Sequence, residues 1–251
     1  MEGKKFDVVK LCYNFVRPDE TIPITEYNDF KHEVRNILMN PRTWKTYLVS
    51  DSPLQFYNIE LVHHEDHSGQ SNCMRITFNN KEIIEGNISH MMIALVSDKY
   101  VRQEACPTID DVPSDRQVEL SCTSIPYSPD VTMVYINYNN WKTGFCKALD
   151  RDGYDAKWNN ETNICDIKNE KFGDRYPCFN NNPELLIKEY RQYVINHEIG
   201  HALGRGHFVP NKKSTKNNVG KPSPVMMQQT KGLFNFDVNT WPLPAEDCQV
   251  T

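Results

Sequence analysis

Hydrophobic residues in the first half of the chain fall mainly into short runs that have the character of β-strands. Residues 6–15 are rich in β-branched and aromatic side chains, and Pro18 ends this run. Residues 132–138 alternate as a half-buried strand does. The most apolar run, 90–96, is expected at the centre of a sheet, because a strand that is covered on both faces is continuously apolar.

Two further runs, 56–62 and 74–78, are predicted to be strands that pair with each other around a polar turn. The turn region contains five potential metal ligands, which are His63, His64, Glu65, Asp66 and His67. They are compatible with a second metal site. A solvated, flexible turn has the same composition, so the sequence leaves both interpretations open.

The hydrophobic period changes to that of a helix in two places. After Thr25 the apolar residues fall on one stripe, formed by Tyr27, Phe30, Val34, Ile37 and Leu38, and Pro41 closes the segment. A second helix is predicted from Pro183 to about Leu203. Asn182 can cap this helix, and proline is favoured at the first helical position.

Composition sets the class of protein. The chain has 251 residues, 39% of them hydrophobic and 24% charged, which is typical of a soluble globular protein. Its net charge is −5 and it has no basic run, so we expect no nucleic acid and no acidic membrane surface as partner. The longest apolar run, 91–96, is too short to span a bilayer. We found no repeat and no linker, and therefore expect one domain over residues 1–251.

Cysteine usage and the N-terminal residues give conflicting indications of the compartment. Eight dispersed cysteines without a C-x-x-C pair favour disulfides over a cysteine zinc site. Residues 1–15 carry no signal-peptide hydrophobic region, so either the chain is not exported by that route or this is a mature form. We favour an extracellular or other oxidising setting. The glycosylation sequons at 87–89 and 160–162 add little, since such triplets are common in an Asn-rich chain.

The motif that organises the chain lies at residues 196–207, which read N-H-E-I-G-H-A-L-G-R-G-H. Positions i and i+4 share one face of a helix, so His197 and His201 can direct imidazole nitrogens at one ion. Glu198 adjoins the first ligand and can hold a water that is bound to the ion. The sequence therefore predicts a helical metal site with a carboxylate beside it.

A third ligand is predicted beyond the end of this helix. Gly204 can adopt the left-handed conformation that ends a helix, which lets His207 return to the metal. Three neutral imidazoles with an open fourth position are typical of a catalytic zinc site. Downstream, residues 223–229 read S-P-V-M-M-Q-Q. Met226 by itself would be ordinary core filler, but its place after the third histidine fits a methionine turn.

Together these residues resemble a metzincin zinc peptidase, most closely a largely uncharacterised metzincin-like family best known from secreted actinobacterial proteins. The closest similarity lies in Y-R-Q-Y-V-I, P-V-M-M-Q-Q-T-K-G-L and N-T-W-P, at 190–195, 224–233 and 239–242. Weaker similarity covers Trp44, 93–106 and 133–144. The resemblance implies an α+β domain that has a mixed twisted sheet, a backing helix, an active-site helix carrying H-E-x-x-H-x-x-G-x-x-H, and a Met-turn.

The chain departs from this family at several points. The family usually has a cysteine soon after the third histidine and a partner after Gly-Leu, where this chain has 208–210 and 234–235. Many metzincins have a tyrosine just after the Met-turn, where Gln228 and Gln229 stand here. An insertion of about 144–182, rich in Asn, Asp and Lys with three cysteines, is long enough to be either stapled or functional.

The cysteines allow specific expectations. The resemblance and their place at the two ends of one Pro- and Asp-rich excursion favour a disulfide between Cys106 and Cys122. At least one bridge is expected within the insertion, among Cys146, Cys165 and Cys178. Cys12 could cap the metal, but a disulfide or a core position is the favoured interpretation. Residues 233–244 carry apolar anchors and are expected to pack under the site.

The expected function is that of a zinc-dependent endopeptidase with one catalytic Zn²⁺. In this interpretation Glu198 is the general base, and Gly204 and Met226 support the ligands His197, His201 and His207. A protein or peptide substrate would add a strand to the sheet at an edge near 117–122. Two alternatives stay open: a zinc hydrolase of another amide or cross-link, and a non-catalytic structural or binding protein with a vestigial site.

Overall fold

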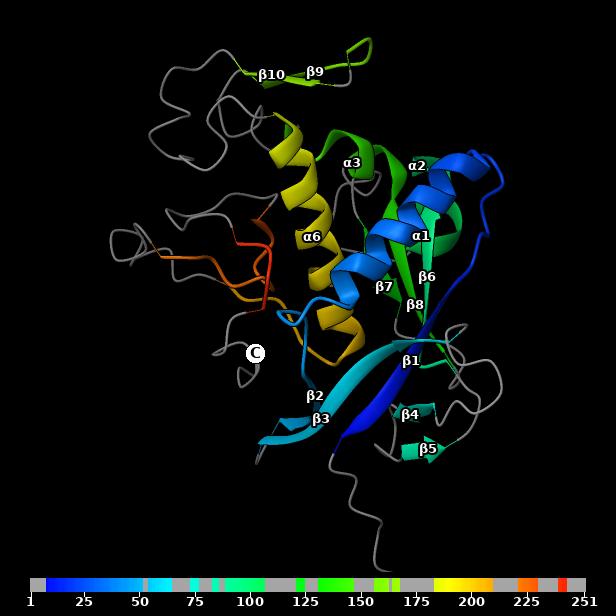
Figure 1. The fold of residues 1–251 in the computed structure, drawn as a ribbon, viewed down its shortest axis with the longest axis vertical. Helices are drawn as coiled ribbons and strands as arrows, with labels where there is room; N and C mark the ends of the chain where they lie inside the picture. Colours follow the sequence, from blue (N-terminus) through cyan, green and yellow to red (C-terminus); the bar gives the residue numbers. More distant parts are fainter. Residues whose placement is uncertain are drawn as a thin grey trace, which may run out of the picture.

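A mixed β-sheet of eight strands lies at the centre of the molecule (Figure 1). The computed structural model describes residues 8–51, 54–64, 73–76, 83–85, 89–106, 121–124, 131–146, 156–162, 164–167, 183–209, 221–229 and 239–242. The strands are β1 Val9–Phe15, β2 Thr46–Asp51, β3 Leu54–His63, β4 Met74–Ile76, β5 Ile83–Glu85, β6 Met91–Val96, β7 Cys122–Ser124 and β8 Thr132–Asn137. Six of them follow the order β2-β3-β1-β6-β8-β7, and β4 and β5 attach beside β1.

The middle of the sheet is parallel and its two ends are antiparallel. Strands β3, β1, β6 and β8 run in one direction, with Tyr13 opposite Met91 and Met91 opposite Thr132. Strand β2 is antiparallel to β3, and β7 is antiparallel to β8. The apolar run 90–96 forms β6 between β1 and β8, so its predicted central position is confirmed, as is the α+β class with a mixed sheet.

The predicted pairing of 56–62 with 74–78 is wrong. Strand β3 pairs with β1 on one edge, and β2, which the hydrophobic pattern did not reveal, takes its other edge. No edge of β3 is then left for β4, which instead lies beside β1, with Met74 opposite Leu11, and pairs with β5. A disulfide between Cys12 and Cys73 holds the start of β4 in this place. Cys12 is therefore not available as a metal cap.

Two helices cover one face of the sheet. They are α1, Ile24–Leu38, and α6, Pro183–Ala202 (Figure 1). The stripe predicted for α1 is the set of side chains that the helix buries. Ile93 and Leu95 of β6 belong to the same core cluster. Burying one such side chain contributes about 1.5–3 kcal/mol, so this shared core fixes α6 on the sheet.

The opposite face is covered by shorter elements. Helix α2, Asp98–Tyr100, leads into a π-helical turn, η2, at Val101–Ala105. Ala94 and Val96, which alternate with the residues facing α1 and α6, pack with η2 in a second apolar cluster. Both faces of β6 are thus covered, which explains its continuous apolar character.

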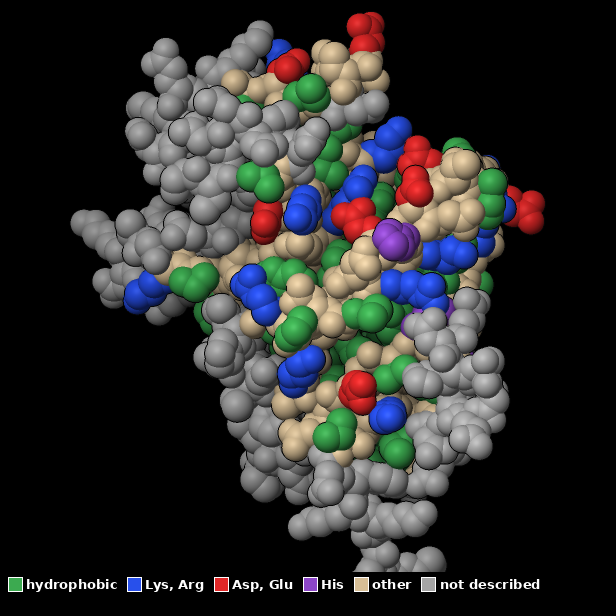
Figure 2. Space-filling view, viewed as in Figure 1, with side chains coloured by type: hydrophobic (Ala, Val, Ile, Leu, Met, Phe, Trp, Pro, Cys, Tyr) green, Lys and Arg blue, Asp and Glu red, His purple; other side chains and the backbone are tan. Residues whose placement is uncertain are grey.

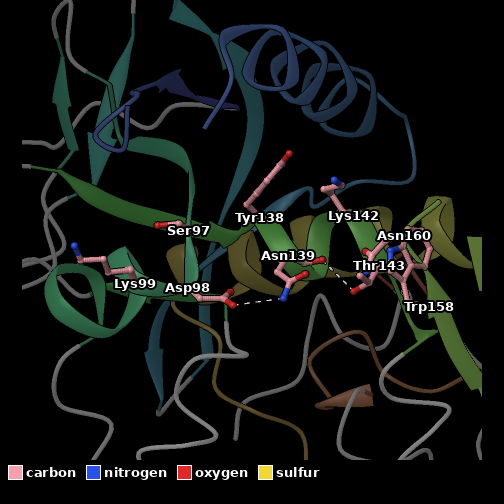
Figure 3. A pocket seen from close by; sticks show the side chains of 9 residues that line it. All are labelled: Ser97, Asp98, Lys99, Tyr138, Asn139, Lys142, Thr143, Trp158 and Asn160. Atoms are coloured by element: carbon pink, nitrogen blue, oxygen red, sulfur yellow. Dashed lines mark hydrogen bonds between the residues drawn. The ribbon is translucent and has the colours of Figure 1, made fainter. Parts of the chain in front are cut away.

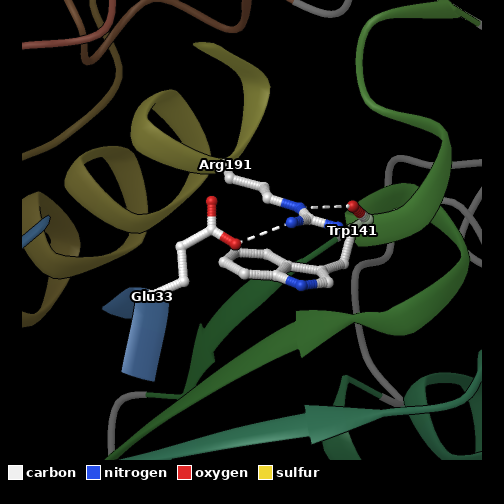
Figure 4. A network of polar contacts seen from close by, with 3 residues as sticks. All are labelled: Glu33, Trp141 and Arg191. Atoms are coloured by element: carbon white, nitrogen blue, oxygen red, sulfur yellow. Dashed lines mark hydrogen bonds and ion pairs between the residues drawn. The ribbon is translucent and has the colours of Figure 1, made fainter. Parts of the chain in front are cut away.

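A polar network fixes the outer side of α6 (Figure 4). The Arg191 guanidinium donates to Glu33 of α1 at 2.6 Å and to the main-chain oxygen of Trp141 at 3.0 Å. It also lies over the Trp141 ring, 4.8 Å from the centroid. Trp141 belongs to α3, Tyr138–Thr143. One side chain therefore links three helices, which restricts rotation of α6 about its own axis.

The insertion contains a hairpin held by a disulfide. Strands β9, Ala156–Asn159, and β10, Ile164–Ile167, pair antiparallel, and Cys146 is bonded to Cys165. The expectation of a bridge within the insertion is confirmed, and so is the bridge between Cys106 and Cys122. Cys178 lies outside the described residues.

The surface shown in Figure 2 carries charges of both signs. Lys and Arg side chains alternate with Asp and Glu over α1 and its neighbours and do not gather by sign. None of the helices in the described part of the chain combines the length and apolar character that crossing a bilayer requires.

Candidate metal centre

Helix α6 places His197, Glu198 and His201 at its C-terminal end. His197 and Glu198 are each 5% exposed, and the ring centroids of His197 and His201 are 4.8 Å apart. Nδ1 of His197 lies 2.8 Å from the main-chain oxygen of Val225. A carbonyl only accepts, so Nδ1 carries the proton of the neutral ring, and Nε2 presents its lone pair.

The chain reverses after α6 through a helix cap centred on Gly204. Gly204 has φ 85°, and its N–H donates to the main-chain oxygen of His201 at 2.9 Å. The next N–H, that of Arg205, donates to the main-chain oxygen of Gly200 at 3.0 Å. These two bonds define a Schellman motif, which requires a left-handed residue at this position. Gly204 has the left-handed conformation that was predicted for it, and His207, which follows the turn, lies beside His201.

Three imidazoles converge beyond this cap. His201 Nε2 lies 3.1 Å from His207 Nε2, and the potential ligand atoms of His197, His201 and His207 all lie within 4.8 Å of one another. His201 Nδ1 contacts the Arg205 oxygen at 2.8 Å, so its Nε2 also presents a lone pair. A metal ion placed between these nitrogens would accept a lone pair from each neutral ring. The three residues could therefore hold a metal ion.

The spacing of the His201 and His207 nitrogens fits two ligands of one tetrahedral metal ion. Nitrogen ligands at 2.0–2.1 Å from a tetrahedral zinc ion stand about 3.3–3.4 Å apart, close to the 3.1 Å between His201 and His207. Burial lowers the pKa of His201, which keeps this ring neutral as a ligand must be. His197 is buried, His201 half-buried and His207 exposed, so one side of the site faces solvent.

Arg205 fixes the orientation of His201, a role that the motif did not reveal. Its guanidinium lies 4.3 Å from the centroid of the Trp44 ring and donates to Thr46 of β2, to the main-chain oxygen at 3.1 Å and to Oγ1 at 2.6 Å. The Arg205 carbonyl then accepts from His201 Nδ1. Such outer partners fix the tautomer and the ring plane of a ligand. A charged residue between two glycines was the only signal in the sequence.

Asn196 anchors the start of the motif and was also missed as a functional position. It is fully buried and donates from Nδ2 to the main-chain oxygens of Gln192 and Thr240, at 3.0 and 2.8 Å. The Trp44 indole donates to the Asn196 carbonyl at 2.7 Å. The segment 239–242 therefore packs against α6 near the site, as expected for this part of 233–244. Residues 233–238, 243 and 244 lie outside the described residues.

The segment containing Met226 packs directly against the helix between two ligands. Met227 N–H donates to Pro224 at 3.0 Å and closes a turn, and Met226 is 4% exposed. A Cβ added at Gly200 would lie 2.3 Å from Met226 Sδ and 2.9 Å from Trp44. A side chain at position 200 would therefore force Met226 and Trp44 to move, a constraint that the sequence pattern did not reveal.

The Glu198 carboxyl is buried and faces the edge strand β7. Thr123 Oγ1 donates to Glu198 Oε2 at 3.0 Å. Burial raises the pKa of Glu198 to about 8, and the hydrogen bond from Thr123 opposes this shift. The edge near 117–122 was predicted to receive substrate. The observed edge strand is β7, Cys122–Ser124, which shares only Cys122 with that prediction, and 117–120 lie outside the described residues.

Gln228 is a further polar group at the triad. Its side-chain nitrogen lies 3.1 Å from His207 Nε2. Gln229 turns the other way, because its side chain contacts Asn239 and its N–H donates to the hydroxyl of Tyr193 at 3.1 Å. Of the two glutamines that follow Met227, only Gln228 contacts a histidine of the triad.

The second cluster of potential ligands is not assembled in the described residues. His63 is buried and contacts Arg35, and His64 lies 2.9 Å from Ser89 Oγ. Glu65, Asp66 and His67 lie outside the described residues. In the part of the chain that the structure describes, the triad is the only group of three or more ligand side chains close enough to share an ion.

A separate cavity lies where β6 and β8 end, facing the β9–β10 hairpin (Figure 3). Its volume is about 300 Å³, and none of the three histidines lines it. The one carboxylate in its wall, Asp98, accepts from Asn137 at 2.8 Å and from Asn139 at 3.4 Å. Because Asp98 already accepts hydrogen bonds from two neighbouring side chains, the histidine triad is a better candidate for a catalytic site than this cavity.

Comparison with known proteins adds one match. A family model described as "Protein of unknown function (DUF3152)" matches residues 182–248, a span that includes α6, the three histidines and the Met226 segment. No curated protein matches the chain.

Proposed function

We propose that this protein is a zinc-dependent endopeptidase of the metzincin type. The observation that carries the proposal is the convergence of His197, His201 and His207 beside the buried carboxyl of Glu198 on one helix. Three neutral imidazoles leave a fourth position open, which is the arrangement of catalytic rather than structural zinc. When bound there, zinc would polarise a scissile carbonyl and lower the pKa of a bound water.

Glu198 is assigned as the general base. It follows the first ligand directly in α6, and its buried carboxyl has a pKa raised to about 8 in the metal-free chain. A nearby cation lowers such a pKa again, so the metal favours the carboxylate that accepts a proton from water. The protonated carboxyl can then return that proton to the departing amine, whose nitrogen is more basic than a carboxylate.

In this proposal Gln228 supplies the polar group that a tyrosine after the Met-turn supplies in many metzincins. Its amide lies 3.1 Å from a ligand nitrogen, and hence near the open side of the site. With His207 engaged by metal, the amide N–H can donate to the carbonyl oxygen on which charge develops. Met226, buried against Gly200, serves as the Met-turn floor beneath the ligands.

The substrate is proposed to bind as an extended peptide along β7. This strand stands at one end of the strand order and next to Glu198 through Thr123. Addition of a strand at such an edge satisfies main-chain hydrogen bonds of both partners. The three disulfides support an extracellular or other oxidising setting for this activity.

The test combines metal analysis with cleavage of a proteome-derived peptide library by the purified, disulfide-bonded chain. We expect one zinc ion per chain and cleavage that stops when a chelator removes the metal. A library that stays intact while zinc is bound would refute the endopeptidase. Release of ammonia or of cross-linked peptides in its place would favour a zinc hydrolase of another amide.

A further inference from the structure

A hydroxyl group of the edge strand β7, that of Thr123, contacts the candidate catalytic carboxyl of Glu198. Thr123 Oγ1 lies 3.0 Å from Glu198 Oε2 and 2.9 Å from the main-chain oxygen of the same residue. Thr123 is half-buried and Glu198 is 5% exposed, so water has little access to this contact. The hydroxyl thus has two acceptors within reach on one residue.

A threonine hydroxyl has one proton, which it donates to one of these two acceptors at a time. A carboxylate oxygen is the stronger acceptor of the two, because hydrogen bonds to ionised groups are stronger than those to neutral groups. The Thr123 hydroxyl is therefore placed to hold the Glu198 carboxylate in a fixed orientation relative to its own main chain.

We propose that Thr123 is a positioning residue that holds the Glu198 carboxyl in one orientation in the site. The inference rests on the proposed function, in which Glu198 takes a proton from water and returns it to the amine. A carboxyl that is already oriented needs no reorganisation when the substrate reacts.

The backbone around Thr123 is suited to this task. Strand β7 pairs antiparallel with β8, with Thr123 opposite Val134, and the preceding residue, Cys122, is bonded to Cys106. The hydroxyl is therefore presented from a strand that is fixed on two sides. Positioning groups are effective when their own geometry is restrained in this way.

The first experiment compares Thr123→Val, which keeps the shape and removes the hydroxyl, with Thr123→Ser, which keeps the hydroxyl. In the zinc-loaded enzyme we expect kcat of the valine variant to fall about 10- to 100-fold, the range for a hydrogen bond to a charged group. KM and zinc content should stay unchanged, and serine should restore most of kcat. If the Thr123→Val variant does not fold, Thr123→Ala is measured in its place. Thr25→Val, which removes the hydroxyl of an exposed threonine of α1, is the control and should match wild type.

The second experiment does not depend on turnover. Binding of acetohydroxamate to the zinc-loaded protein is measured by calorimetry in wild type, Thr123→Val, Glu198→Ala and the double variant. We expect valine to weaken binding about tenfold when Glu198 is present and to have a much smaller effect when it is absent, since only the contact with the main-chain oxygen is then left to lose.

Three results would overturn the positioning role: a valine variant with wild-type kcat, a serine variant as slow as valine, or additive effects in the calorimetric cycle. Failure of the proposed function has a different signature, because wild type would then bind zinc and cleave no peptide. In that case the coupling between Thr123 and Glu198 in acetohydroxamate binding still decides whether Thr123 positions the carboxyl.

Discussion

The candidate metal centre has a buried half and an open half, which are held in different ways. His197 and Glu198 are each 5% exposed and lie within α6, with Trp44, Met226 and Thr123 packed around that part of the helix. His207 is exposed, and it stands with Gln228 on segments beyond the helix. The buried half can fix the geometry of the ligands and the carboxyl, while the open half admits solvent and substrate. Changes in the two halves should therefore have different consequences.

The largest effect is expected from loss of a ligand. His201→Ala and His207→Ala should both weaken zinc binding by more than about 100-fold, the upper end of what loss of an outer-shell partner costs. His201→Ala should also destabilise the metal-free chain more than His207→Ala does, because it removes the 2.8 Å contact of a half-buried ring with the Arg205 carbonyl, whereas His207 is exposed. Zinc competition with a chromophoric chelator and urea unfolding measure the two quantities.

The exposed His32 of α1 provides the control, and His32→Ala should leave both quantities unchanged. Equal stability of the two metal-free ligand variants would contradict the division into a buried and an open half.

Acid should act on the buried half through His90. Burial lowers the pKa of His90 to about 4, below the ordinary value of 6.5, and its Nε2 lies 3.4 Å from the Ala202 carbonyl at the end of α6. Between pH 6.5 and 4 the unfolded chain binds a proton that the folded chain does not, so stability falls as the pH falls. The full loss amounts to about 3 kcal/mol.

Urea unfolding of the metal-free chain at pH 7 and pH 4.5 measures this loss. His90→Gln should show a smaller difference between the two pH values than wild type, whatever its absolute stability. An unchanged difference would mean that His90 is not the group responsible.

The contact between Gly200 and Met226 should be intolerant of one added methyl group. Gly200→Ala places Cβ against Met226 Sδ and the Trp44 ring, and overpacking of this kind costs about 1–3 kcal/mol. Met226→Ala makes room, so the double variant Gly200→Ala/Met226→Ala should be more stable than the sum of the single changes predicts. If the changes in the free energy of unfolding measured with urea are strictly additive, the Cβ at position 200 and the Met226 side chain do not contact each other.

The smallest effect is expected in the open half. Gln228→Ala should reduce kcat about tenfold, in proportion to the loss of one hydrogen bond in the transition state, with zinc content and stability unchanged. Peptide-cleavage kinetics and metal analysis measure these quantities, and Lys221→Ala, at an exposed residue of the same segment 221–229, is the control. A loss of zinc in Gln228→Ala would instead identify the amide as a ligand.

Local spacing explains which features could be predicted from the sequence. His197, His201 and His207 lie within eleven residues, so the helical period and one left-handed glycine determine how they converge. The buried stripe of α1 follows from the same period. In each case the interacting residues are neighbours in the sequence, and their geometry is that of one element.

The features that were missed depend on residues far apart in the chain. The Arg205 side chain contacts Thr46, which is 159 positions away in the sequence, and Thr123 contacts Glu198, which is 75 positions away. A lone threonine in a three-residue strand has no periodicity that could mark it. The wrong prediction for the partner of β3 has the same origin. Strand β2 pairs with β3, but the hydrophobic pattern did not reveal β2 as a strand.

The most direct test of the account is a comparison of wild type with Glu198→Gln, in which the fold, the zinc content and the peptide-cleavage rate are measured on the same preparations. We predict that both proteins bind one zinc ion per chain and unfold alike, and that the variant loses at least about 10²- to 10⁴-fold in kcat, as expected when a general base is removed. Cleavage by Glu198→Gln at the wild-type rate, or a wild-type protein that binds no zinc, would contradict the assignment of this site as a zinc peptidase centre.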